Sequence, residues 1–280
     1  MSIITLTTDY GLKDHFVGAL KGKLLSEFPE AKIIDISHDI DPFNSAEAAY
    51  TIGAAYASFP KGTVHLIGVD AELNKENQHL AMQWNDHFFI CADNGILSML
   101  TQKIIPQKVV AITIHDRLPV AATDLDIFVT VASHLAKGGL LNVIGKETKT
   151  IKQVTELQPI IEQNAIKGYV IYIDHFGNVV TNITKKIFLE TAKGRPYEIM
   201  LSERIRQQKG NIKNIWPKYS DIAISNNYPI KNYEGDKLAI FNEAGYLEIA
   251  IFRSNPSRVG SAASLLGLGY RDMIMVVFSG

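Results

Sequence analysis

Two aspartates stand at the ends of predicted strands, where side chains are available for binding. Asp9 follows the β-branched residues 3–8, and Asp70 follows a second apolar strand pattern over residues 64–69. Ligands of open parallel sheets collect at the carboxyl ends of the strands, so the Asp9 carboxylate is placed to accept hydrogen bonds from a sugar diol. An aspartate at a strand end also commonly caps a turn, and no Gly-x-Gly-x-x-Gly phosphate motif accompanies this one.

The elements around these residues predict two domains. Strands over residues 3–8, 32–38 and 64–70 alternate with helices over residues 18–28 and 46–58, which indicates a mainly parallel α/β domain. A hairpin over residues 79–91 and helices over 96–101 and 123–137 follow. A polar stretch over residues 148–168 marks the boundary, and short strands separated by turns predict a small β-barrel or sandwich beyond it. We place the domains at residues 1–160 and 161–280.

Composition excludes several classes of protein. The 28 basic and 29 acidic residues balance to a net charge of -1, so no nucleic-acid partner is expected. Cys91 is the single cysteine, which excludes an internal disulfide and a multi-cysteine zinc site. The histidines lack metal-binding spacing, so no metal is expected. We see no secretion signal or apolar span, and we therefore expect a soluble cytoplasmic protein without a membrane partner.

Six segments, in this order, resemble the S-adenosylmethionine hydroxide adenosyltransferase and fluorinase family. They are TTDYGLKDHFVGALKG (7–22), DISHDIDPFN (35–44), FPKGTVHLIGVD (59–70), ADNG (92–95), IDHFGNVVTNI (173–183) and AGYLEIAI (244–251). The resemblance implies an amino-terminal α/β domain and a carboxyl-terminal β-barrel domain. It also implies a homotrimer with ligand sites between neighbouring subunits.

The same resemblance implies a set of substrate-binding residues. Asp9 would bind the ribose hydroxyls. Phe43 would place its aromatic ring beside the ligand, or it would have only an ordinary packing role in the protein. Other members of the set would contact the methionine amino group and the adenine, and they are Asp174, Phe176, Asn178, Ser261 and Ala262. The segment around Asp174 also fits a hairpin turn, and we expect it to serve both purposes. An apparent insertion over residues 253–260 precedes Ser261.

The family reaction is an in-line attack on the 5′ carbon of S-adenosylmethionine, with methionine as the leaving group. A sulfonium is already an activated electrophile, so no cofactor is expected. Of the family's Asp, Arg and His set, Asp70 is retained, Asn77 stands at about the place of the arginine with Lys75 as the nearest cation, and Thr123 replaces the histidine. A halide would be repelled by Asp70, which disfavours halogenation.

Three functions remain open. In the first, Asp70 activates water, positioned by Thr123 and Lys75, and S-adenosylmethionine is hydrolysed to adenosine and L-methionine. In the second, the pocket binds S-adenosylmethionine or adenosine without turnover. In the third, the chain is a Rossmann-like nucleotide enzyme unrelated to this family.

Overall fold

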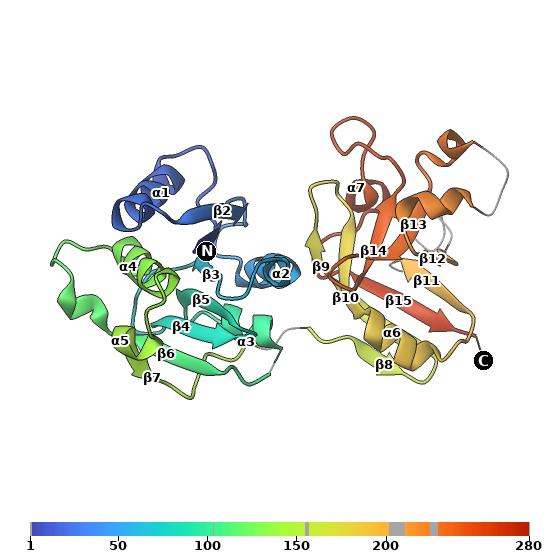
Figure 1. Cartoon of the computed structure of the whole chain (residues 1–280). Coiled ribbons are helices and arrows are strands. Elements are labelled where there is room, and N and C mark those ends of the chain that lie inside the picture. Colours follow the sequence, from blue (N-terminus) through green and yellow to red (C-terminus); the bar gives the residue numbers. More distant parts are fainter. Residues whose placement is uncertain (1, 103, 155–156, 202–210, 225–228, 280) are drawn as a thin grey trace. The chain divides into compact units, whose positions relative to one another are not determined.

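The computed structural model describes residues 2–102, 104–154, 157–201, 211–224 and 229–279. The chain divides into two compact units, Met1–Thr155 and Glu156–Gly280 (Figure 1). The predicted combination of an α/β domain with a β domain is confirmed. In the part of the chain described, none of the helices combines the length and the apolar character that crossing a membrane requires.

Unit 1 is built on a seven-stranded sheet in the order β2-β1-β3-β5-β4-β6-β7. The strands are β1 (Ile3–Thr8), β2 (Lys32–Ser37), β3 (Val64–Gly68), β4 (His79–Trp84), β5 (His87–Ala92), β6 (Lys108–Ile112) and β7 (Gly145–Glu147). The pairs β2–β1, β1–β3 and β3–β5 are parallel, and the pairs β5–β4, β4–β6 and β6–β7 are antiparallel. The hairpin between β4 and β5 turns at Asn85 and Asp86, whose φ angles of 48° and 63° are typical of a tight two-residue turn.

Helices cover both faces of this sheet. They are α1 (Phe16–Glu27), α2 (Ser45–Ala55), α3 (Ile96–Thr101), α4 (Asp124–Ala136) and α5 (Leu141–Ile144), with 3-10 turns η1 (Tyr56–Ser58) and η2 (Ile114–Arg117). Successive strand residues point to opposite faces, so Leu66 joins the core beneath α1 and α4, whereas Ile67 joins the core beneath α2 and α3. The polar ends of β1 and β3 thus lie on a scaffold that is packed on both sides.

Cys91 lies in β5 at the centre of this sheet. Its side chain is fully buried in the core beneath α2 and α3. Burial, followed by the charge of Asp93, raises the pKa of the thiol above its ordinary value. A thiol in this state is not a nucleophile, and the residue serves as a small core side chain.

Unit 2 is a curled, half-barrel sheet whose hydrogen-bonded path runs β11-β15-β9-β10-β14-β13-β12, with β8 paired to β9 (Figure 1). Its strands are β8 (Ile160–Glu162), β9 (Ala165–Ile173), β10 (Val179–Thr184), β11 (Tyr197–Leu201), β12 (Ile215–Trp216), β13 (Lys237–Phe241), β14 (Tyr246–Ile251) and β15 (Met273–Phe278). The helical segments are α6 (Lys185–Ala192), η3 (Tyr219–Ala223), η4 (Ile230–Tyr233) and α7 (Ala262–Leu266). The larger core cluster of this unit includes Ile199, Leu247 and Ile274, and a smaller cluster includes Leu238 and Phe252.

Candidate functional site

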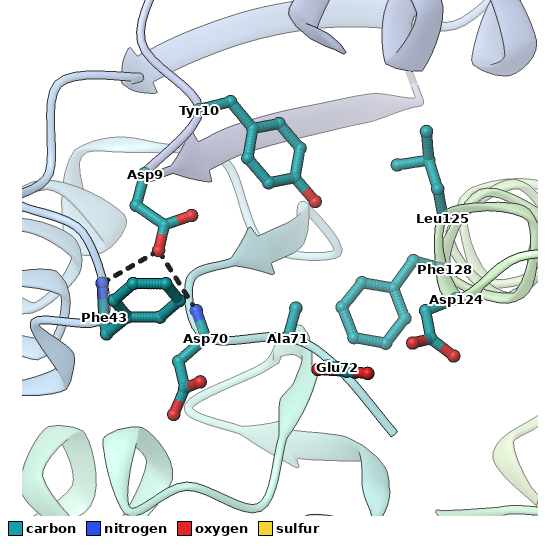
Figure 2. A pocket seen from close by; sticks show the side chains of 9 residues that line it. All are labelled: Asp9, Tyr10, Phe43, Asp70, Ala71, Glu72, Asp124, Leu125 and Phe128. Carbon is teal, nitrogen blue, oxygen red and sulfur yellow. Dashed lines mark hydrogen bonds between the residues drawn. The ribbon is translucent and has the colours of Figure 1, made fainter. Parts of the chain in front are cut away.

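A cavity of about 280 Å³ opens at the carboxyl ends of β1 and β3 in unit 1 (Figure 2). Nine residues line it: Asp9, Tyr10, Phe43, Asp70, Ala71, Glu72, Asp124, Leu125 and Phe128. They come from the ends of β1 and β3, from the loop before α2 and from the first turns of α4. The structure therefore brings three of the sequence-predicted site residues, Asp9, Phe43 and Asp70, to one cavity.

The Asp9 carboxylate holds two of the loops that form the cavity. Its Oδ2 accepts a hydrogen bond from the backbone N–H of Phe43 at 3.0 Å and from that of Asp70 at 3.3 Å. Phe43 and Asp70 have φ angles of 64° and 43°, which are uncommon for residues with side chains. Such conformations persist where the surroundings enforce them, so Asp9 stabilises the cavity wall as well as lining it.

Hydrogen bonds from buried side chains fix the loop that begins at Asp70. The side-chain amide of Asn94 donates to the carbonyl oxygens of Val69 at 2.9 Å and Asp70 at 3.2 Å. Nε2 of His79, on β4, donates to the carbonyl oxygen of Ala71 at 2.9 Å. The loop thus has a defined path across the mouth of the sheet.

The end of β1 is tied to its neighbours in the same way. The Thr8 hydroxyl hydrogen bonds Nδ1 of the buried His38 at 2.7 Å, and Nε2 of His38 lies 3.1 Å from Asp35. On the other side of β1, a Cβ added at Gly68 would come within 3.2 Å of the Tyr10 hydroxyl oxygen. Glycine at this position therefore leaves room for the Tyr10 ring beside β3.

Negative charge dominates the cavity. Four of the nine lining residues are acidic, and none is Lys or Arg. Burial, followed by the charges of Asp9 and Asp124, raises the pKa of Tyr10 above its ordinary value. The Tyr10 hydroxyl is thus a protonated hydrogen-bond donor at neutral pH, and the surrounding carboxylates favour a cationic ligand over an anionic one.

Two predicted catalytic residues lie outside the set that lines the cavity. Thr123 is the N-cap of α4 and forms a capping box with Asp126, in which the Thr123 backbone N–H donates to the Asp126 carboxylate at 2.9 Å and the Asp126 N–H donates to the Thr123 hydroxyl oxygen at 3.4 Å. The Thr123 hydroxyl also donates to the same carboxylate at 2.8 Å. Lys75 is exposed on the loop before β4. The cation that contacts Asn77 is Lys152, whose Nζ donates to the Asn77 Oδ1 at 3.2 Å.

A second group of predicted residues meets in unit 2, at the turn between β9 and β10. The two carboxylate oxygens of Asp174 accept hydrogen bonds from the backbone N–H of Asn178 at 2.8 Å and from its side-chain amide at 3.0 Å. The turn conformation expected from the sequence is confirmed, and it uses the Asn178 amide donor internally. The Phe176 ring projects from the turn with 63% of its surface exposed.

The amino end of α7 packs against this turn. Gly177, with φ of 71°, lies so close to Ser261 that an added Cβ would be 2.3 Å from the Ser261 side chain. The Gly177 carbonyl also accepts the Ala263 N–H at 3.0 Å. Ser261 caps α7 and Ala262 is buried in the core, so these two residues bring the helix end to the Phe176 turn.

Sequence reasoning missed six of the nine residues that line the cavity. They are Tyr10, Ala71, Glu72, Asp124, Leu125 and Phe128. Tyr10 lies inside the quoted TDYG motif, and Asp124 directly follows the predicted Thr123. Their position next to predicted site residues was the one signal in the sequence that could have identified them. Within the described ranges, no group of three or more His, Cys, Asp or Glu side chains has an arrangement suited to a metal ion.

Comparison with known proteins gives consistent matches along the chain. Residues 4–145 match the SAM hydroxide adenosyltransferase N-terminal domain, and residues 168–275 match the corresponding C-terminal domain. An (R)-S-adenosyl-L-methionine hydrolase of Methanocaldococcus jannaschii is 29% identical, with 99% of this chain and 97% of the relative covered. An (R)-S-adenosyl-L-methionine hydrolase of Salinispora tropica is 32% identical over 63% of this chain and 70% of the relative.

Among solved structures, an uncharacterized conserved protein from Thermotoga maritima has a similar fold. The TM-score is 0.82 at 27% sequence identity, and the match covers 98% of this chain and 99% of that one. The architecture of both units is thus shared with a solved protein over nearly its full length. Since the two domain models match both units in order, the chain belongs to the SAM hydroxide adenosyltransferase family.

Proposed function

We propose that this protein hydrolyses S-adenosylmethionine to adenosine and L-methionine. The observation that carries the proposal is the cavity that joins Asp9 and Asp70 at the strand ends, in a chain alignable over 99% of its length with an S-adenosylmethionine hydrolase. The acidic lining suits a substrate that carries a sulfonium charge. It disfavours a halide nucleophile, because the four acidic residues that line the cavity would repel an anion.

In this proposal, the lining residues bind and orient the substrate. The Asp9 oxygen that does not bridge the two loops accepts hydrogen bonds from the ribose diol, and the exposed Phe43 ring covers the nucleoside. Asp70 accepts a hydrogen bond from the attacking water and orients it. The water oxygen forms the new bond to the 5′ carbon, and the bond to sulfur breaks with its electron pair remaining on methionine. The water's proton leaves through a carboxylate of the cavity.

The unit 2 residues have the chemistry to bind the rest of the substrate. We propose that Asp174 attracts the methionine ammonium group and that Phe176 and Asn178 contact the adenine. Ser261 and Ala262 support that surface. The working assembly is a cytoplasmic homotrimer in which a neighbouring subunit supplies these residues, and the reaction uses no cofactor.

Hydrolysis is tested with S-adenosylmethionine in heavy-oxygen water. The purified protein should release adenosine that carries the heavy oxygen, because the new carbon–oxygen bond comes from water. In Asp70→Asn, kcat should fall by about 100-fold. This substitution keeps the backbone N–H of residue 70, which donates a hydrogen bond to Asp9. Wild-type release at the rate of the enzyme-free reaction would reject hydrolysis.

The second candidate is a protein that binds S-adenosylmethionine or adenosine without turnover. The positions of Thr123 and Lys75 favour it, since neither side chain lines the cavity that holds Asp70. Titration calorimetry separates the two functions. A silent binding protein takes up S-adenosylmethionine with measurable heat and returns it unchanged, whereas a hydrolase converts it during the titration.

A further inference from the structure

Asp124 is the one acidic cavity residue that is both on a helix and oriented by contacts on a neighbouring loop and strand. It occupies the first turn of α4, and its Oδ2 accepts a hydrogen bond from the backbone N–H of Leu73 at 3.0 Å. Its Oδ1 lies 4.0 Å from Nε2 of His79. Figure 2 shows the Asp124 side chain leaving α4 beside Phe128. The carboxylate is therefore held by the Leu73 N–H and lies beside the His79 ring at the cavity wall.

The support behind Asp124 is rigid and uncharged. The His79 side chain is fully buried, and Nε2 must carry its hydrogen because it donates to the Ala71 carbonyl. The ring packs edge-on against Phe128, with centroids 4.6 Å apart. Burial lowers the pKa of His79, so the ring is neutral at physiological pH and leaves the Asp124 charge uncompensated.

The other acidic residues of the cavity are less suited to proton transfer. Asp9 Oδ2 already accepts two backbone hydrogen bonds, from the N–H groups of Phe43 and Asp70, so this oxygen is engaged in holding the two loops. Glu72 is exposed on its loop. The Asp70 carboxyl group extends away from that of Asp9 in Figure 2. Asp124 and Tyr10 line the same cavity, and the charge of Asp124 contributes to the raised pKa of Tyr10.

A water molecule that attacks carbon needs acceptors for both of its hydrogens. Its lone pair faces the electrophile, so its two O–H groups point away from the 5′ carbon, toward hydrogen-bond acceptors in the cavity wall. Asp70 supplies one acceptor in the proposed function. We propose that Asp124 is a catalytic residue that supplies the second acceptor and takes the proton as general base. This inference rests on the proposed hydrolysis.

The atoms of the step balance without a further reactant. The water oxygen bonds to the 5′ carbon, the carbon–sulfur electron pair stays on the sulfur of methionine, and one water proton moves to an Asp124 oxygen. The Asp124 carboxyl group then releases this proton to solvent. His79 is a positioning residue, since it contacts Asp124 and the Ala71 loop and no reacting atom.

The first test compares two aspartates on the same helix turn. Asp124→Asn keeps an acceptor for the Leu73 N–H but loses the base, so kcat for labelled adenosine should fall by about 100-fold. The dissociation constant for S-adenosylmethionine should change by less than about threefold by calorimetry, since the shape is kept. Asp126→Asn makes the same change in a residue that pairs with Lys23 outside the cavity, and its kcat should stay within about twofold of wild type.

The second test is chemical rescue. In Asp124→Ala, added formate can occupy the vacated space and accept the proton, so the release of heavy-oxygen adenosine should rise with formate concentration. The same formate should leave wild type and Asp126→Ala unchanged. A structural role for Asp124 would give no such recovery.

The outcomes separate this inference from the function on which it rests. An inactive wild-type protein overturns both. An active wild type overturns Asp124 alone in any of three cases: Asp124→Asn keeps its kcat within about threefold, Asp126→Asn loses as much as Asp124→Asn, or formate fails to restore Asp124→Ala. Loss in Asp124→Asn with recovery by formate in Asp124→Ala supports the assignment.

Discussion

The carboxylate of Asp9 accepts hydrogen bonds from two loops whose backbones both have positive φ at the contact, at Phe43 and Asp70. From the sequence, ligand binding and turn capping were alternative roles for this side chain. In the structure one oxygen bridges the loops, while the group as a whole lines the cavity. The two roles are therefore compatible at the scale of a single residue, because a carboxylate has two oxygens.

We expect Asp9→Ala and Asp9→Asn to differ. Alanine removes the acceptor for both loop N–H groups, so the free energy of unfolding should fall by about 1 to 3 kcal/mol and adenosine binding should be lost. Asparagine keeps one acceptor oxygen and should preserve stability better than binding. Urea denaturation and calorimetry with adenosine measure the two effects, and Asp14→Ala, at an exposed position, is the control. Unchanged adenosine affinity in Asp9→Ala would reject the ribose assignment.

At the scale of elements, a buried histidine links three strands of the unit 1 sheet. Nδ1 of His65, on β3, hydrogen bonds the Thr5 hydroxyl of β1 at 2.7 Å, and its Nε2 lies 3.2 Å from Nδ1 of His87 on β5. The ring stacks on Phe89 with centroids 4.8 Å apart. Burial, followed by the charge on His87, lowers the pKa of His65 to about 3.

This pKa predicts loss of stability in acid. The unfolded chain protonates His65 near its ordinary pKa of about 6.5, whereas the folded protein does so only near 3, so the unfolded state binds more protons between these values. The free energy of unfolding should fall by roughly 2 to 3 kcal/mol from pH 7 to pH 4.5 on this account. Urea titrations that follow Trp84 fluorescence in a Trp216→Phe background would measure it. A His65→Leu variant with the wild-type pH slope would contradict the assignment.

Much of the element pattern follows from local sequence. The strand over Ile3–Thr8 and the helix over Ile96–Thr101 occur at their predicted positions. The sequence reading missed α6 (Lys185–Ala192), a helix of eight residues that begins immediately after β10, because the chain changes from strand to helix without a loop. The Thr184 hydroxyl oxygen accepts a hydrogen bond from the backbone N–H of Ile187 and thereby caps the amino end of α6.

The candidate site was predictable to a similar extent. Asp9 and Asp70 were found because strand ends of a parallel sheet meet at one edge. Thr123 was chosen because it stands at the position of the family's histidine, whereas in the structure it is the N-cap of α4 and the next residue, Asp124, lines the cavity. Lys75 was chosen by nearness in sequence, whereas Asn77 is contacted by Lys152, which is distant in sequence.

At the scale of the whole molecule, each unit presents an exposed aromatic ring beside its group of polar residues. Phe43 is 74% exposed in unit 1 and Phe176 is 63% exposed in unit 2. Aromatic side chains are enriched in interfaces and ligand sites, where their rings are covered. These rings support the proposed homotrimer, in which each would be buried by ligand or by a neighbouring subunit.

The trimer makes a direct prediction for solution mass. Light scattering coupled to size-exclusion chromatography should give three times the chain mass of 31.0 kDa. Phe176→Ser should weaken S-adenosylmethionine binding because the ring stacks on the adenine in this proposal, whereas Leu189→Ser, at an exposed apolar position of α6, should leave binding unchanged. A monomeric mass at micromolar concentration would contradict the assembly.

The buried thiol of Cys91 can report local opening of the amino-terminal unit. A maleimide or disulfide reagent can reach the sulfur only when β5 separates from the helices that cover it, and the chain has no other cysteine to compete. The rate of labelling in native buffer therefore measures how often the amino-terminal unit opens, without a signal from the carboxyl-terminal unit. Slower labelling on adding adenosine would reveal ligand coupling to that opening.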